Sequence, residues 1–180
     1  MYFEETGLPW VPPSPNIPTV DSALAYVGTC LYEGTNLSEG RGTTQPFEQI
    51  GAPWLDQASV MRRIDPIALQ GAGLRSCWFR PTFSKHAGTL CAGFQLHVFD
   101  RALFRPYTAG IALLDAIRAV HPDFAFLPPP ADGPCTIDLL AGTDELRLAP
   151  DERQDFLIRA AQEAAEFAGK SRDCHLYRDA

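Results

Sequence analysis

Residues 89–100, TLCAGFQLHVFD, decide the fold we expect, because their side chains alternate with a period of two. The apolar members share one face: Leu90, Ala92, Phe94, Leu96 and Val98. The other face carries Gln95 and His97, and such alternation predicts a strand. Residues 74–83, LRSCWFRPTF, are aromatic enough to predict a second strand. The two strands, joined by a turn at 84–88, predict an antiparallel pair.

Helices are predicted on both sides of this pair. Thr19 is a typical N-cap for a helix that ends near Gly28, with Leu24, Val27 and Leu31 facing inward. Further helices are expected within 55–69, from Pro106 to His121, over 136–140 and over 151–167. We therefore predict an α+β fold in which helices flank a small, mainly antiparallel sheet or an open β-barrel-type core. A length of 180 residues predicts a single domain over 1–180.

Composition excludes several classes of function. The net charge of −7, with scattered arginines, argues against a nucleic-acid partner. No apolar run is long enough to span a membrane, and the first ten residues, MYFEETGLPW, lack the features of an export signal. The five cysteines have no spacing that suits zinc. They are expected to be small buried residues, although Cys77 and Cys91 on neighbouring strands could form a disulfide.

Residues 33–54, EGTNLSEGRGTTQPFEQIGAPW, are predicted to form a functional loop. The segment is rich in polar residues, and its glycines and prolines break any regular period. We therefore expect no core helix or strand in it. Two carboxylates, an arginine and an asparagine lie within nine residues, which is unusual for a surface linker.

Glu33 and Glu39 are the candidate catalytic residues in this loop. Glycoside hydrolysis generally uses two carboxylates, about 5 Å apart for a covalent route and farther apart when a water must fit between them. The alternative is that both carboxylates bind backbone amides and pair with Arg41, which would hold the loop closed. A carboxylate in a buried pair with Arg41 would be a poor general acid.

Five other residues are candidates for substrate binding. Asn36 and Ser38 suit sugar hydroxyl or acetamido groups, although they could equally bond within the loop. His97 could reach the same cleft from its strand or be a satisfied residue of the sheet face. Asn16 follows a proline-rich arm, LPWVPPSPNIP at 8–18, in which Trp10 either lines the cleft or pins the arm to the core. Arg41 completes the set. No metal site is expected.

Four segments resemble one family. They are WVPPSPNIPT at 10–19, GTCLYEGTNLSEGRGTTQPFEQIGAPW at 28–54, FRPTFSKHAGTLCAGFQLHV at 79–98 and IDLLAGT at 137–143. Together they resemble the C-terminal domain of the bacterial exo-β-N-acetylmuramidases, the NamZ family, formerly a domain of unknown function. The resemblance covers nearly all of residues 5–147, and the long loop motif is its most specific part.

The resemblance implies a role in peptidoglycan breakdown. Family members look like two-domain glycoside hydrolases, with a Rossmann-like N-terminal domain and a β-barrel-type C-terminal domain around a shared cleft. They remove N-acetylmuramic acid from the non-reducing ends of cell-wall fragments, which implies an extracytoplasmic or cell-wall location and no cofactor. By transfer, the candidates that shape the cleft or contact substrate are Asn16, Glu33, Asn36, Ser38, Glu39, Arg41 and His97.

The family's proposed catalytic glutamates belong to the N-terminal domain, which we expect this chain to lack. We therefore expect it to be inactive alone and to act with a separate Rossmann-like domain on peptidoglycan fragments or muropeptides. Glu33 and Glu39 are catalytic candidates only through their own chemistry. One alternative is a stand-alone, non-catalytic carbohydrate or cell-wall binding module. Another is a remnant that dimerises through an apolar patch around Trp10 and Trp54.

Overall fold

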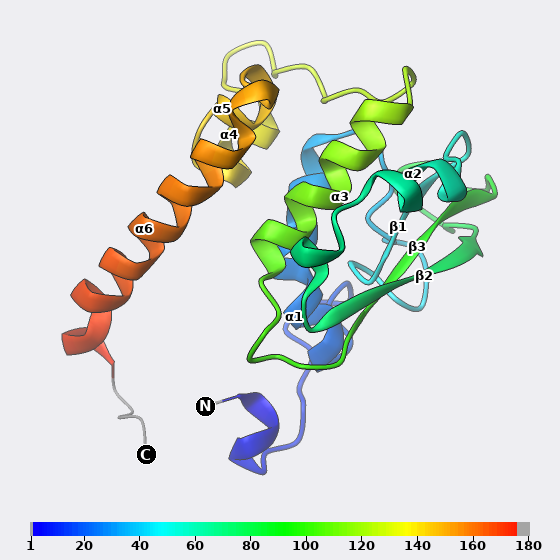
Figure 1. The fold of residues 1–180 in the computed structure, drawn as a ribbon. Coiled ribbons are helices and arrows are strands. Elements are labelled where there is room, and N and C mark those ends of the chain that lie inside the picture. The colour runs from blue at the N-terminus through cyan, green and yellow to red at the C-terminus, as the bar shows by residue number, and fades with distance from the viewer. Residues whose placement is uncertain (1, 176–180) are drawn as a thin grey trace.

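The protein is described by a computed structural model, which covers residues 2–175 (Figure 1). Its three strands are β1 (Gln49–Ala52), β2 (Ala72–Phe79) and β3 (Cys91–Val98). The α-helices are α1 (Val20–Thr29), α2 (Gln57–Arg63), α3 (Pro106–Val120), α4 (Thr136–Ala141), α5 (Glu145–Leu148) and α6 (Arg153–Ser171). Short 3-10 turns occupy Phe3–Thr6, Cys30–Gly34, Pro66–Leu69, Pro150–Glu152 and Arg172–Cys174.

The strands form one antiparallel sheet in the order β1-β3-β2. Gln95 of β3 lies opposite Gln49 on one side and Arg75 on the other, so β3 is the central strand. This confirms the predicted pairing of the two longer strands and the α+β class, with an open sheet as its core. The four residues of β1 correct one expectation, because they lie within the loop that was predicted to hold no core strand. Ile50 of β1 is completely buried.

Helix α3 is the centre of the molecule. It lies between the sheet and the C-terminal helices α4 to α6 (Figure 1). On the sheet side, Leu114 and Ile117 pack with Phe94 and Ile50. On the other side, Ile111 packs with a second cluster: Leu31, Ile137, Leu146 and Phe156. Because α3 is buried from two directions, it connects both parts of the core.

Helices α1 and α3 approach closely enough that their backbones touch. A Cβ atom on Gly28 would lie 2.0 Å from the carbonyl oxygen of Pro106, and one on Gly110 would lie 2.6 Å from the carbonyl oxygen of Gly28. Only glycine fits at such a contact. The N-cap prediction for α1 is confirmed, because the Thr19 hydroxyl accepts from the Ser22 amide at 3.0 Å. Val27 was predicted to face inward, but it is 54% exposed because α3 covers the glycine face of the helix instead.

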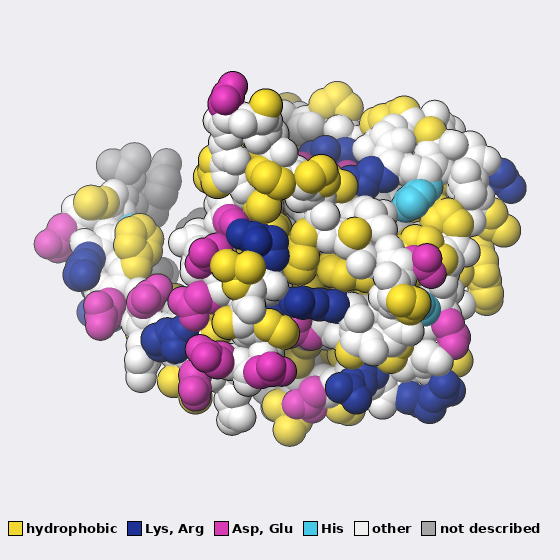
Figure 2. All heavy atoms as spheres, turned by 90° about the horizontal axis from the view of Figure 1, so that it is seen from above, with side chains coloured by type: hydrophobic (Ala, Val, Ile, Leu, Met, Phe, Trp, Pro, Cys, Tyr) yellow, Lys and Arg dark blue, Asp and Glu magenta, His cyan; other side chains and the backbone are white. Residues whose placement is uncertain are grey.

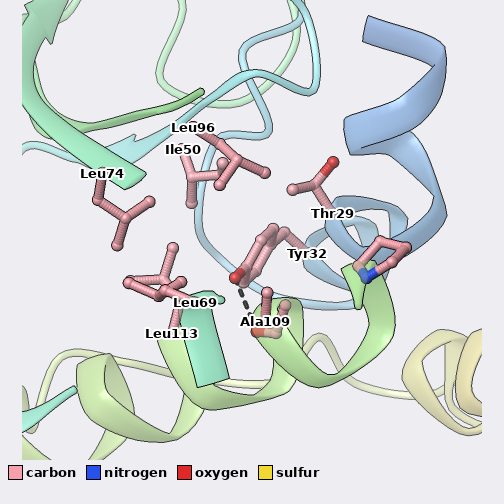
Figure 3. Close-up of a pocket in the computed structure, with 10 residues that line it drawn as sticks. Thr29, Tyr32, Ile50, Leu69, Leu74, Leu96, Ala109 and Leu113 are labelled. Atoms are coloured by element: carbon pink, nitrogen blue, oxygen red, sulfur yellow. Dashed lines mark hydrogen bonds between the residues drawn. The ribbon is translucent and has the colours of Figure 1, made fainter. Parts of the chain in front are cut away.

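Tyr32 fills the space between α3 and the sheet (Figure 3). Its hydroxyl donates to the Gly110 carbonyl at 2.8 Å, and the ring is completely buried. The remaining void beside it is about 10 Å³, which is about the smallest space that holds one water. Burial raises the pKa of Tyr32 well above its ordinary value. This hollow therefore belongs to the core and is no ligand site.

Candidate functional site

Backbone hydrogen bonds fix the loop that follows the Cys30–Gly34 turn to β1 and to the segment between β2 and β3. Ser38 and Gly51 exchange two backbone hydrogen bonds, of 2.8 and 3.0 Å, so residues 38–51 close on themselves. At the other side the Thr82 amide donates to the Gly42 carbonyl at 2.9 Å. The loop is thus held between its own end at β1 and the segment that joins β2 to β3.

Four charged side chains form an alternating row along this loop, and we call them the charge cluster: Glu33, Arg41, Glu39 and Lys85. The Arg41 Nη2 atom donates to Glu33 Oε2 at 2.6 Å. The Arg41 Nε atom lies 3.7 Å from Glu39 Oε1, and Lys85 Nζ donates to Glu39 Oε2 at 2.9 Å. The Glu39 side chain is only 1% exposed, whereas those of Glu33 and Arg41 are 22% and 32% exposed. The buried end of the cluster is therefore Glu39 with Lys85, and the accessible end is Glu33 with Arg41.

Lys85 enters this cluster from the turn between β2 and β3. Besides Glu39, its Nζ atom donates to the carbonyl oxygens of Tyr32 at 2.7 Å and Leu37 at 3.0 Å. Desolvation lowers the pKa of Lys85, and the Glu39 carboxylate opposes that effect. The ammonium group satisfies carbonyls at the end of the Cys30–Gly34 turn, so it ties three segments together.

The turn that presents Lys85 has an unusual backbone. Ser84 and His86, on either side of it, have φ values of 69° and 57°. Non-glycine residues rarely occupy this left-handed region, and they persist there where the surrounding contacts favour it. His86 Nε2 lies 2.8 Å from the Asn36 carbonyl oxygen, which is one such contact.

Asn36 and Ser38 use their polar atoms on the protein's own backbone. The Asn36 side chain accepts from the Ala125 amide at 3.0 Å and donates to the Asp123 carbonyl at 2.7 Å. Ser38 is 2% exposed, and its hydroxyl accepts from the Gly40 amide at 3.2 Å. Asn36 therefore fastens the loop to the segment after α3, and Ser38 stabilises the turn inside the loop.

Asn16 and His97 are the two candidates that lie outside the loop at 33–54. The Asn16 backbone amide donates to Ser14 Oγ at 3.2 Å within the proline-rich arm. The His97 ring is parallel to that of Phe99, at an interplanar angle of 3° and a centroid separation of 6.4 Å. The structure thus joins Glu33, Glu39 and Arg41 to one another, whereas Asn36 and Ser38 bond to the backbone and Asn16 and His97 lie elsewhere.

The sequence reasoning missed Lys85. It is one of only two lysines in the chain, and it lies in a turn where no periodicity singles it out. The glycine-rich loop predicted that charged groups would meet, but the partner of Glu39 comes from a segment 46 residues away. The available signal was a single lysine in a predicted turn, with no acidic residue between 66 and 99 to pair with it locally.

Residues 2–175 contain neither a cluster of side chains arranged for a metal ion nor a helix that could span a membrane. Within that range, no group of three or more His, Cys, Asp or Glu side chains is arranged to hold a metal ion. The helices there are too short or too polar to cross a bilayer. All five cysteines are free, and Cys77 and Cys91 pack together with Phe79 without a disulfide.

Comparison with known proteins gives the family. A family model described as "Exo-beta-N-acetylmuramidase NamZ, C-terminal" matches residues 24–177. The peptidoglycan β-N-acetylmuramidase NamZ of Bacillus subtilis (strain 168) is 47% identical over 148 residues. That match covers 82% of this chain and 34% of the relative, so the chain spans about a third of that protein's length.

Two solved structures, both DUF1343 family proteins of Bacteroides fragilis, have the same fold. One superposes with a TM-score of 0.82 at 23% identity, and the match covers 99% of this chain and 48% of the Bacteroides chain. The other gives a TM-score of 0.64 at 26% identity, with 94% and 44% covered. Because the family model matches most of the chain and the similarity to NamZ is extensive, the chain belongs to the family of NamZ C-terminal domains.

Proposed function

We propose that this domain forms one wall of the substrate cleft of a peptidoglycan exo-β-N-acetylmuramidase. In that role it contributes to the removal of N-acetylmuramic acid from the non-reducing ends of cell-wall fragments. The observation that carries the proposal is the 47% identity to a protein named peptidoglycan β-N-acetylmuramidase. Since the chain matches only 34% of that relative, the proposal includes a second, Rossmann-like domain that supplies the rest of the active site.

The two candidate glutamates have different roles in this proposal. Glu39 is enclosed by Lys85 and Arg41 and is 1% exposed, so it positions the loop and does not meet substrate. Glu33 is 22% exposed and shares its hydrogen bond with Arg41, which is itself 32% exposed. Glu33 and Arg41 are therefore the members of the charge cluster that can contact a sugar, and Glu33 is the carboxylate that this chain can offer to the reaction.

A chimera tests the proposal directly. The matching region of the Bacillus subtilis relative is replaced by residues 24–177 of this chain, and hydrolysis of a chromogenic β-N-acetylmuramide is measured. We expect the chimera to be active and the chain alone to be inactive. A chimera that folds, as judged by circular dichroism, and yet has no activity would overturn the proposal.

Two variants of the chimera locate the contribution of the charge cluster. Glu33→Gln removes the accessible carboxylate and should lower kcat/KM by about 10²-fold or more if that group takes part in proton transfer. Glu145→Gln, which changes an exposed carboxylate on α5, is the matched control and should leave the rate unchanged.

The proposed substrate is a cell-wall polymer, so the proposal also includes action at the cell wall.

A further inference from the structure

The second half of helix α6 is not covered by the rest of residues 2–175. Each of residues 161–170 is exposed, and this part of α6 extends away from the rest of the protein (Figure 1). A helical segment of this length is marginal in water unless one of its faces packs on another element. In this chain only helix propensity stabilises the segment, and its whole length is open to a partner.

A crevice opens where α6 leaves the body of the protein. It has a volume of about 370 Å³, and the α6 side chains in its lining include Phe156, Ala160 and Glu163. Tyr107 of α3 and the turn after α4 form other parts of the lining. Phe167 follows Glu163 by four residues and Ala160 by seven, so it continues the same side of the helix. We call Phe156, Ala160, Glu163 and Phe167 the inner face of α6.

This face has the composition of an interface between domains. Its centre is apolar, since the rings of Tyr107 and Phe156 lie 6.4 Å apart in the crevice and the Phe167 ring beyond them is 69% exposed. Its edge is charged, because Glu163 lines the crevice and Lys170 follows it by seven residues. An apolar centre inside a charged rim is typical of surfaces on which proteins dock.

The crevice is close to the accessible end of the charge cluster, and Cys30 lies between them. Burial raises the pKa of the Cys30 thiol, and the nearby Glu33 carboxylate raises it further. Burial also raises the pKa of Tyr107 in the crevice, and Cys30 adds to that rise. Val27, whose carbonyl oxygen lies 3.8 Å from Cys30 Sγ, is 54% exposed although it is a large apolar residue. The surface therefore runs from Glu33 past Val27 and Cys30 to the crevice.

Relatives contain further chain that could cover this surface. The superposition on one Bacteroides structure covers 99% of this chain, and therefore includes α6, but only 48% of that protein. The helix thus occurs there together with about as much additional chain. The matching family model describes a C-terminal region, so the remainder of such a protein precedes it. The first residues of this chain and the end of α6 lie towards the same end of the molecule (Figure 1). A preceding domain would therefore join on the side towards which α6 extends.

We propose that the inner face of α6, the crevice and Val27 form the docking surface for the preceding, Rossmann-like domain. The inference rests on the proposed function, which includes that domain, and it adds where the domain binds. A domain docked on this surface borders Glu33, so the substrate cleft lies between the charge cluster and the docked domain. Helix α6 then acts as an arm that fixes the orientation of the two domains.

Hydrogen–deuterium exchange, measured by mass spectrometry, tests this docking. The isolated chain is compared with the chimera that joins residues 24–177 to the remainder of the Bacillus subtilis relative. We expect the amides of residues 161–170 to exchange rapidly in the isolated chain and about 10²-fold or more slowly in the chimera. Equally rapid exchange in both proteins would overturn the proposal. Protection that grows with the concentration of the isolated chain would also overturn it, because the occupant would then be a second copy.

Two substitutions in the chimera test the inner face itself. Phe167→Arg should speed exchange of residues 161–170 at least about tenfold, whereas the same substitution should leave the Tm of the isolated chain unchanged. Ile158→Arg is the matched control, since Ile158 is 50% exposed and lies about two and a half turns before Phe167, on the opposite side of α6. It should leave the exchange unchanged. Equal effects of the two substitutions would show that the inner face is not the docking surface.

The docking test and the hydrolysis test can fail independently. An active chimera in which residues 161–170 exchange rapidly would overturn the docking surface and leave the muramidase proposal intact. Protection of these residues in a folded but inactive chimera would overturn the muramidase proposal and leave the docking surface. If the chimera does not fold, the intact Bacillus relative and its isolated C-terminal domain provide the same comparison of exchange.

Discussion

Helices α3 and α6 show two ways in which this chain forms a helix. Seven of the fifteen residues of α3 are buried, between the sheet and the C-terminal helices. Of the nineteen residues of α6, all of them described, only Phe156 is buried. Charged side chains gather on the side of the C-terminal helices (Figure 2). The fold around α3 therefore depends on close packing, whereas α6 depends mainly on the helix propensity of its Ala-rich sequence.

Ion pairs differ between the two regions in the same way. In the loop beside the sheet, the Glu39–Lys85 pair is almost enclosed, with Glu39 at 1% exposure. On α6 the Glu166–Lys170 pair spans 3.8 Å with both side chains at least 70% exposed. Removing one partner of a buried pair leaves the other charge unpaired and out of contact with water, which is destabilising. An exposed pair contributes little to stability. Substitutions should therefore have large effects around α3 and small effects on the exposed part of α6 that follows its first turns.

The largest effect is expected from Lys85→Met. The variant leaves the Glu39 carboxylate buried without its ammonium partner and removes the donor to the Tyr32 and Leu37 carbonyls. We expect the free energy of unfolding, measured by urea denaturation, to fall by about 3–5 kcal/mol. Loss of a surface lysine would cost less than about 0.5 kcal/mol, and a result of that size would show that the pair is not buried in solution.

A double variant separates the stranded charge from lost packing. Adding Glu39→Gln to Lys85→Met replaces the carboxylate by a neutral amide of similar size. We expect the double variant to recover more than half of the lost stability, because a neutral group is less costly to bury than an unpaired charge. If it were as unstable as the single variant, packing of the lysine stem would be the larger cause.

A pair of glycine substitutions compares the regions next. Gly28→Ala would place a Cβ atom 2.0 Å from the Pro106 carbonyl oxygen, so α1 and α3 must move apart. We expect thermal and urea denaturation to show a loss of about 1–3 kcal/mol. Gly169→Ala on α6 meets no atom within 4 Å and should stabilise the helix by up to about 1 kcal/mol. Equal effects of the two substitutions would contradict the difference in packing.

A smaller effect is expected in the pH dependence of stability. Burial raises the pKa of Cys91 to about 11 from its ordinary value of 9.0. In that interval the unfolded thiol releases its proton first, so the unfolded state binds fewer protons and stability falls as pH rises. Cys91→Ala should make the decline in Tm between pH 9 and 11 shallower. Cys174→Ala, at an exposed cysteine beyond α6, is the control and should leave the decline unchanged.

Local patterns were sufficient for the elements with a strong signal. The period-two alternation in 89–100 predicted β3, and the Thr19 cap and Pro106 start predicted α1 and α3. Local patterns were not sufficient for β1, because its four residues lie among glycines and prolines and are too few to show an alternation of apolar and polar side chains. Its pairing with β3 is a long-range contact, which tertiary structure decides and local propensity does not. The exposure of Val27 has a similar cause, because the side of α1 that α3 covers is set by Gly28 and Gly110.

The candidate site was predicted in part for the same reason. Glu33, Glu39 and Arg41 are close in sequence, so a glycine-rich loop could be expected to bring them together. Lys85, and the Asn36 partners Asp123 and Ala125, come from distant segments, and no spacing in the sequence predicts these contacts. Whether Glu33 takes part in catalysis remains a prediction, which the chimera and its Glu33→Gln variant address.

The smallest effect on stability is expected for Phe167→Ala, at the exposed end of α6. Phe167 lies near the end of α6 and is 69% exposed. Helical spacing places it on the same side of α6 as Phe156, but the later part of α6 extends away from the rest of the protein (Figure 1). Removing an exposed ring loses little buried area, and alanine is the best helix former. We therefore expect a change of no more than about 0.5 kcal/mol in the free energy of unfolding.

Phe156→Ala is the matched substitution in the same helix, since its ring is 6% exposed and packs with Leu31, Ile111 and Leu146. It should cost about 3 kcal/mol or more. If Phe167→Ala were equally destabilising, the end of α6 would be packed in solution, either on the body or on a second molecule. Sedimentation at two protein concentrations would distinguish these cases, because only the second depends on concentration. A small effect at Phe167 beside a large one at Phe156 would instead show that α6 is attached to the core through its first turns alone.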